Sequence, residues 1–140
     1  MITVEVSAHV NPTEDRDRVQ SAIEGIFPCL EYEFQEREGF TSRLLGTGDR
    51  DSLELLHELL RSRKILDTGR RNMHIEGGTV TFILNKQAAT VGKVSFPAGD
   101  EPLGSIWVEI VAQDADEAAR VVDWLAPPTE KGHPQFEIEL

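Results

Sequence analysis

Five basic side chains within eleven residues are the feature of this chain best suited to binding a polyanion. Only Asp67 opposes their charge, and they are Arg61, Arg63, Lys64, Arg70 and Arg71, here called the basic cluster. Because the planar guanidinium group of arginine pairs bidentately with phosphate oxygens, the cluster predicts contacts with a nucleic-acid backbone. The alternative is structural, since cations near a helix C-terminus favour the helix dipole and pair with nearby acids.

The charge around the basic cluster makes it conspicuous. The 140 residues include 25 Asp and Glu against 14 Lys and Arg, which gives a net charge of −11. Residues 39–99 nevertheless carry nine basic and six acidic side chains. A positive region on an acidic body is expected of a polyanion-binding face. Aromatic residues are scarce near the cluster, so phosphate and shape contacts with a structured RNA are favoured over base reading.

The acidic excess also has an interpretation that involves no binding site. Ten of the basic residues are Arg and only four are Lys. A surface of this kind stays hydrated at high salt, which indicates a halophilic cytosol, the alternative being an ordinary acidic protein. In the halophilic case most carboxylates serve solvation, and no pair of them stands out as a general acid and base.

A second polar group, Asn85-Lys86-Gln87, directly follows a predicted strand. Asn85 and Gln87 are candidate ligand contacts, and Lys86 and Arg43 are candidate additions to the RNA-binding residues. The structural alternative is a tight connection whose side chains satisfy backbone groups. A third interpretation, a small-molecule enzyme, requires a deep pocket with perturbed titrating groups near these residues.

The remaining reactive residue types indicate no chemistry of their own. The four histidines are scattered without metal-ligand spacing, and Cys29 has no partner for an intramolecular disulfide. We expect Cys29 to be a buried thiol, and Gly46-Thr47-Gly48-Asp49 to cap a helix rather than cradle an anion. The sequence therefore predicts no metal, no cofactor and no catalytic residue. The chain also shows no secretory leader and no membrane span, so we expect a cytoplasmic protein.

The elements that position these residues follow from hydrophobic periodicity and from turn signals. Asn11 to Glu14 reads as a helix start, Asp114 and Glu117 as a second capping pair, and Trp107 and Trp124 as core residues. The expected strands are 3–10, 31–35, 40–45, 79–84, 91–96, 105–111 and the edge strand 136–140, with a hairpin turn at 37–39. Helices are expected after Asn11, after Asp49, towards Arg71 and after Asp114.

The resulting order is β-α-β-β-α-α-β-β-β-α-β. Hairpins dominate and few strands are joined by helical crossovers. This favours an α+β fold, a mainly antiparallel sheet with helices packed on one face, formed by a single domain over residues 1–140.

Four phrases spread along the chain resemble one family. They are Glu5-Val6-Ser7-Ala8 running into Asn11-Pro12-Thr13-Glu14-Asp15, then Ser42-Arg43-Leu44-Leu45-Gly46, then Leu84-Asn85-Lys86-Gln87-Ala88-Ala89, and Asp123-Trp124-Leu125-Ala126-Pro127 followed by Thr129. Together they resemble an archaeal family of uncharacterised proteins labelled RNA-binding, whose fold is compared with large-subunit ribosomal protein five. The resemblance covers essentially the whole chain.

The resemblance implies a cytosolic archaeal homodimer, linked to a P-loop kinase-like protein. This chain has no Walker sequence ending in Gly-Lys-Ser/Thr, so it lacks that partner's chemistry. The function predicted from the sequence is non-catalytic binding of structured RNA. The alternative is an accessory subunit that docks onto a P-loop kinase-like partner.

Overall fold

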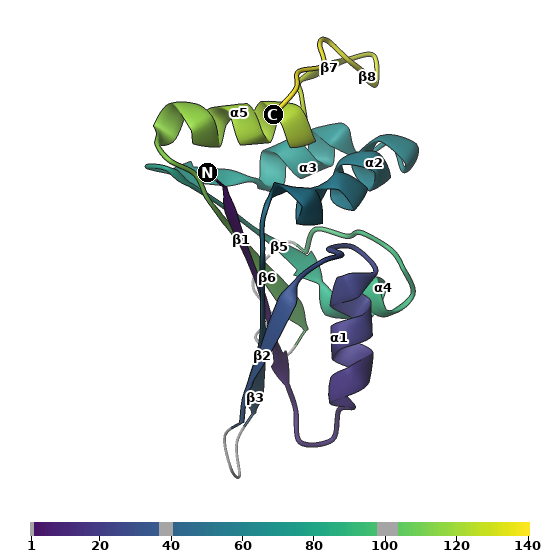
Figure 1. Ribbon diagram of the computed structural model, residues 1–140. Helices are drawn as coiled ribbons and strands as arrows, with labels where there is room; N and C mark the ends of the chain where they lie inside the picture. The colour runs from purple at the N-terminus through teal and green to yellow at the C-terminus, as the bar shows by residue number, and fades with distance from the viewer. Residues whose placement is uncertain (1, 37–40, 98–103) are drawn as a thin grey trace.

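The computed structural model describes residues 2–36, 41–97 and 104–140, which form a six-stranded antiparallel sheet with helices on one face. The strand order is β2-β3-β1-β6-β5-β4. The bounds are β1 (Thr3–Val10), β2 (Glu31–Gln35), β3 (Ser42–Gly48), β4 (His74–Glu76), β5 (Thr79–Asn85) and β6 (Ser105–Val111). Figure 1 views this sheet near its edge, with α1 (Arg16–Glu24) and α4 (Lys86–Thr90) on the same side. The predicted α+β class is confirmed.

The period-two alternation of the strands separates a buried face from an accessible one. Val4, Val6 and Ala8 of β1 are fully buried, and Val6 faces Val108 of β6 across the ladder. On the other side of β1, Ala8 faces Leu44 of β3. Since successive side chains of a strand point to opposite faces, this register gathers the apolar set under the helices.

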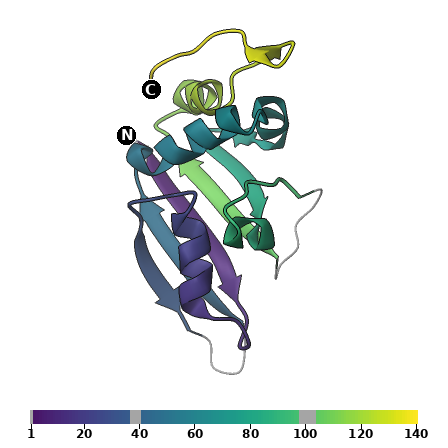
Figure 2. The ribbon, with the colours of Figure 1, turned by 90° about the vertical axis from the view of Figure 1, so that its right-hand side faces the viewer.

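The remaining helices lie across one end of the sheet. They are the 3₁₀ turn η1 (Arg50–Leu53), α2 (Glu54–Ser62), α3 (Leu66–Asn72) and α5 (Ala115–Leu125). Figure 2 shows them at the upper end of the strands, with α1 and α4 in front of the sheet below. The Asp114 carboxylate accepts from the Glu117 N–H at 2.8 Å, and Glu117 Oε1 accepts from the Gln113 N–H at 2.9 Å. The predicted capping pair at the start of α5 is thereby confirmed.

The first helix begins later than its sequence signals indicate. Asn11 to Glu14 forms a closed turn, in which the Glu14 N–H donates to the Asn11 carbonyl and the Asn11 N–H donates to Glu14 Oε1. Asp15 is the N-cap instead, because its side chain accepts from the Asp17 N–H. The Glu14 carboxylate is also bound by Lys86 Nζ, and this tertiary contact holds the turn outside the helix.

The expected strand at 91–96 is wrong, although the predicted order of elements is confirmed. Residues 91–97 form no strand. The three strands predicted between the third helix and the last helix are β4, β5 and β6, so β4 takes the place of the strand expected at 91–96. The Asn85 side chain caps α4, which diverts the chain directly after β5. The N–H groups of Val91, Gly92 and Lys93 then donate to carbonyls of α4, so these residues continue the turn after the helix. The segment touches the end of β5 through the Asn85 N–H, which donates to the Ser95 carbonyl at 2.8 Å, but no strand ladder forms.

The expected edge strand at 136–140 is also wrong. A two-residue hairpin, β7 (Thr129–Glu130) with β8 (His133–Pro134), precedes a tail without strand pairing. Arginine side chains bind the tail's backbone, because Arg120 Nη2 donates to the Glu139 carbonyl and Arg50 Nε to the Leu140 carbonyl, both at 3.1 Å. Ile138 and Leu140 pack against the core without forming a strand, whereas Phe136, the first apolar residue of the alternating pattern, is exposed.

Three further expectations concern loops and the core. β2 and β3 form the predicted antiparallel pair, whereas the expected turn at 37–39 lies outside the described residues. Trp124 is buried as expected. Cys29 is exposed, not buried, and has a left-handed backbone with φ of 66°. It lies in the loop between α1 and β2, where its side chain points out of the core.

Candidate functional site

Arg61 lies in the last turn of α2 and is bound inside the protein. Nη1 donates to the carbonyls of His57 at 2.9 Å and Leu125 at 3.0 Å. Nη2 donates to the Trp124 carbonyl at 2.9 Å and to Glu137 at 2.5 Å, and Nε donates to the same carboxylate at 2.9 Å. All five N–H groups of the guanidinium are therefore engaged, joining α2, the end of α5 and the tail.

A pH prediction follows from the surroundings of this guanidinium. Burial and the Arg61 charge lower the pKa of His57, which stacks on Trp124 at 4.5 Å. The Arg61 hydrogen bond likewise lowers the pKa of Glu137. The unfolded chain then binds more protons than the folded one, so stability falls as the pH drops below about 6.5, and falls further near the carboxylate range.

The measurement is the urea midpoint at about pH 7.5 and about pH 5.5. H57F keeps an aromatic ring on Trp124 without a titrating group, so its midpoint should fall less over this interval. An equal fall in both proteins would assign the pH dependence to other groups.

Arg70 is also engaged by the protein. Its Nη1 donates to Asp123 Oδ1 at 2.8 Å and to the Ala126 carbonyl at 3.0 Å. These bonds tie α3 to the C-terminal end of α5, where the last carbonyls lack partners within the helix. These contacts agree with the structural alternative for the basic cluster, in which cations near a helix C-terminus pair with nearby acids and with helix carbonyls.

The other three members of the basic cluster point outwards. Arg63, Lys64 and Arg71 are exposed, and among the described residues Arg63 makes one hydrogen bond, a long one of 3.5 Å to the Gly92 carbonyl. Arg71 lines a shallow depression beside Pro128 and Thr129. The structure therefore divides the cluster into two side chains bonded to other protein groups and three outward side chains, and phosphate binding by the outward three stays a prediction.

The Asn85-Lys86-Gln87 group is largely structural in its contacts. Asn85 Oδ1 accepts from the Ala88 N–H at 2.8 Å and caps α4. Lys86 is only 4% exposed, and its Nζ donates to the His9 carbonyl at 3.0 Å and to Glu14 Oε1 at 2.9 Å. Gln87 is exposed. Of these three residues, Gln87 presents its side chain to solvent.

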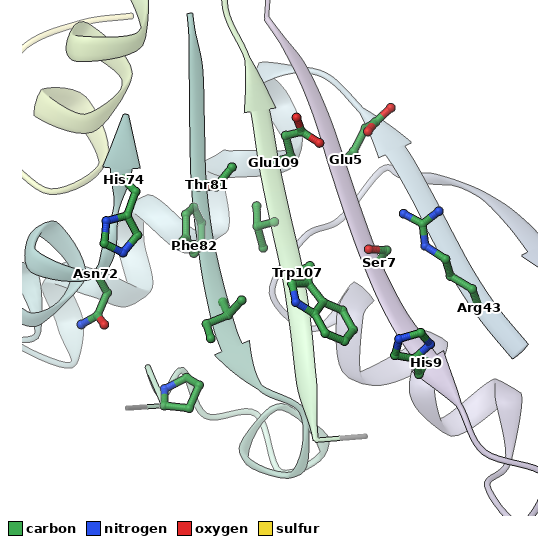
Figure 3. Close-up of a pocket in the computed structure, with 13 residues that line it drawn as sticks. Glu5, Ser7, His9, Arg43, Asn72, His74, Thr81, Phe82, Trp107 and Glu109 are labelled. Atoms are coloured by element: carbon green, nitrogen blue, oxygen red, sulfur yellow. The ribbon is translucent and has the colours of Figure 1, made fainter. Parts of the chain in front are cut away.

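Arg43 lies elsewhere, on the side of the sheet that no described helix covers. We call this side the open face. It carries the alternate residues of each strand, and a hollow of about 630 Å³ lies on it (Figure 3). Arg43 of β3 lines the hollow together with Ser7 and His9 of β1 and Trp107 of β6. Arg43 has no ion pair or hydrogen bond with any residue in the described ranges.

The register places these side chains in neighbouring rows. Ser7 is the cross-strand partner of Trp107, and His9 is the partner of Arg43. The His9 and Trp107 rings meet edge-on with centroids 5.0 Å apart. Glu5 and Glu109, also cross-strand partners, form the next row of the hollow. The hollow thus has an aromatic ring between a guanidinium and two carboxylates.

Trp107 departs from its expected place in the core. Its strand buries Ile106, Val108 and Ile110, so Trp107 and Glu109 point to the open face, where Trp107 is half-buried. The alternation around Glu109 carried this signal in the sequence, since a charged residue two positions away shares the face of the indole. The aromatic residue that the basic cluster lacks is therefore found on the other side of the protein.

The segment of residues 46–49 is part of a strand and of a helix cap. Gly46 and Gly48 belong to β3, and the Asp49 side chain caps η1 by accepting from the Asp51 N–H at 3.0 Å, so the predicted capping role is confirmed for Asp49. Within the described ranges, no three His, Cys, Asp or Glu side chains are grouped to hold a metal ion. None of the helices there is long and apolar enough to cross a membrane.

Comparisons with known proteins agree with the four phrases of the sequence. A family model described as RNA binding matches residues 3–112. A UPF0201 protein from Methanosarcina acetivorans is 42% identical, over 100% of this chain and 93% of the relative. One from Sulfolobus acidocaldarius is 41% identical, over 98% and 95%. The crystal structure of a UPF0201 protein from Methanococcus jannaschii superposes with a TM-score of 0.83 at 36% identity, over 94% of this chain and 98% of that chain. The predicted resemblance is confirmed, and the chain belongs to the UPF0201 family of archaeal proteins.

Proposed function

We propose that this protein binds RNA without catalysis and that the open face of its sheet is the contact surface. The observation that carries the proposal is the hollow around Trp107, which lies on strands within the stretch matched by the RNA-binding family model. That stretch, residues 3–112, runs from β1 to the end of β6 and so includes every strand of the sheet.

The physical argument is stacking supported by a few polar contacts. Proteins that read RNA on a sheet stack unpaired bases on aromatic side chains, while loops and bulges supply such bases within structured RNA. Trp107 offers the aromatic ring, and Arg43, two strands away, offers a fork of donors for a phosphate. A structured RNA that presents an unpaired base in a loop or bulge can make these contacts. Such an RNA also agrees with the structured RNA predicted from the sequence.

Electrostatics limits the backbone contribution. The net charge of −11, together with Glu5 and Glu109 on the open face, repels a polyphosphate chain. Affinity should therefore depend more on the stacked base than on counterion release, and its salt dependence should be shallow. The outward Arg63, Lys64 and Arg71 would add phosphate contacts only to an RNA that reaches the helix side.

The experiment is fluorescence anisotropy with a labelled hairpin RNA that has an unpaired loop and with a blunt duplex of equal length, over a series of KCl concentrations. We expect the hairpin to bind more tightly. W107A should weaken hairpin binding by roughly 5- to 100-fold, the loss of one stacked base. T47A, an exposed substitution on the open face outside the hollow, serves as the control and should bind like the parent protein.

The basic cluster is tested in the same titration. A variant with Arg63, Lys64 and Arg71 all changed to Glu separates the two surfaces, because it leaves the hollow unchanged. Loss of binding in this variant but not in W107A would move the contact surface to the helix side. Absence of saturable binding to either RNA by the folded parent protein would refute the proposed function.

The homodimer and the cytoplasmic location stay predictions from the resemblance, and the halophilic cytosol stays a prediction from the composition. Docking onto a P-loop kinase-like partner has no contact surface in its favour beyond the three outward basic side chains.

A further inference from the structure

The two carboxylates of the hollow have no partners within the part of the chain that the structure describes. Glu5 and Glu109 stand directly opposite each other on β1 and β6, an arrangement that is destabilising for like charges. Neither makes an ion pair or a hydrogen bond with any residue of ranges 2–36, 41–97 and 104–140. A pair of like-charged acceptors beside an aromatic ring fits a ligand that brings hydrogen-bond donors.

Polar atoms beside the indole point the same way. The Nδ1 atom of His9 is buried without a hydrogen-bond partner among the described residues. Buried polar groups normally have such partners. Ser7, which is 7% exposed, lines the hollow between the carboxylate row and the His9 row. The strands that carry these groups and the indole, β1 and β6, are the two central strands of the sheet, so their backbone positions are fixed by pairing on both sides.

The spacing of the rows matches a flat bicyclic ring. Trp107 and Glu109 lie on one face of β6 two residues apart, which is about 7 Å along the strand. Glu5 lies one strand away, at about 5 Å. A purine stacked on the indole therefore reaches the carboxylates with its Watson–Crick edge. In Figure 3, Glu109 and Glu5 lie above Trp107. Arg43 lies on the opposite side of Ser7 from Trp107.

The charge of the carboxylates selects among the bases. Guanine has adjacent N1–H and N2–H donors, which match the two oxygens of one carboxylate, whereas uracil presents carbonyl oxygens on either side of its single N–H. Adenine and cytosine each place a ring-nitrogen acceptor beside the amino group. An ionised carboxylate accepts only, so it pairs with guanine and repels the other edges.

We infer that the hollow is a guanine site, in which the base stacks on Trp107, donates to Glu109 and Glu5, and directs its phosphate towards Arg43. This inference rests on the proposed function and gives it a base preference. It makes the carboxylates, which oppose backbone binding, the specificity determinants of the site.

The test compares two hairpin RNAs that differ by one loop base, guanine or uracil. We expect the parent protein to prefer the guanine loop by at least about fivefold, the lower end of discrimination by a good bidentate pair. E109Q removes the charge and supplies an amide donor, so guanine affinity should fall and uracil affinity should rise. E33Q, the same change on an exposed residue of β2 outside the hollow, should keep the preference.

Two further readings complete the experiment. Competition by GMP but not by UMP against the guanine hairpin would support a site for the guanine base itself, and equal competition by the two nucleotides would overturn it. Equal affinity for both hairpins, or an unchanged preference in E109Q of parent-like urea midpoint, would overturn the inference while leaving RNA binding intact. Failure of both hairpins to bind would refute the proposed RNA-binding function. Titration with GMP alone would then decide whether the hollow binds a guanine nucleotide.

Discussion

The substitution R61M should destabilise the fold by about 2–4 kcal/mol, mainly because it leaves buried backbone carbonyls without donors, whereas Glu137 is 52% exposed and rehydrates. The side chain is 20% exposed and supplies five hydrogen bonds, three of them to backbone carbonyls. Methionine fills much of the same volume but leaves those carbonyls and the Glu137 carboxylate without donors. Urea unfolding followed by circular dichroism measures the loss.

Arg63 provides a matched control, because it belongs to the same basic cluster and lies two residues further on. R63M makes the same chemical change at an exposed position, and its cost should stay within about 0.5 kcal/mol. R61K should not restore stability, since one ammonium group cannot reproduce the planar fork of donors. Equal midpoints for R61M and R63M would contradict the contacts of Arg61.

The second large effect is expected at Lys86. K86M should destabilise the protein by about 2–4 kcal/mol, somewhat less than a fully enclosed pair, because Glu14 is 28% exposed and rehydrates in part. The substitution removes the donor to the His9 carbonyl and to Glu14, and so releases the turn before α1 from the start of α4.

A double-mutant cycle with E14Q isolates this contact. K86M and E14Q together should cost less than the sum of the two single changes, because each removes the same ion pair. K93M, at an exposed lysine nearby in sequence, controls for the loss of charge. Strict additivity would show that the pair is not formed in solution.

Both variants also clarify the RNA question. Arg61 and Lys86 are predicted RNA contacts whose side chains the fold occupies, so their loss should lower stability without weakening RNA binding by the protein that remains folded. W107A should do the reverse, since its side chain lines the hollow and is not part of the core beneath the helices. Stability and binding measured on the same three variants therefore separate structural from binding roles.

Local patterns in the sequence were sufficient for most of the fold. Alternation over residues 3–10 and 105–111 predicts strands with one buried face, and Asp114 with Glu117 predicts the start of α5, because these signals act between neighbours in the chain. The family resemblance has the same origin, as short phrases in a constant order. The α+β class and the order of elements follow from these alone.

The sites depended on contacts between residues far apart in sequence. Arg61 and Arg63 are equivalent by composition, yet only Arg61 faces Glu137, 76 residues away. The expected strand 91–96 does not form because α4 caps on Asn85 and its carbonyls accept from the N–H groups of residues 91–93. Trp107 reaches the hollow because β1 and β6 pair with Ser7 opposite it. The sequence by itself determined which segments form strands and helices, since that depends on local periodicity and caps. Only the tertiary structure decided which charges are satisfied internally and which line a cavity, because strand register and helix packing set those distances.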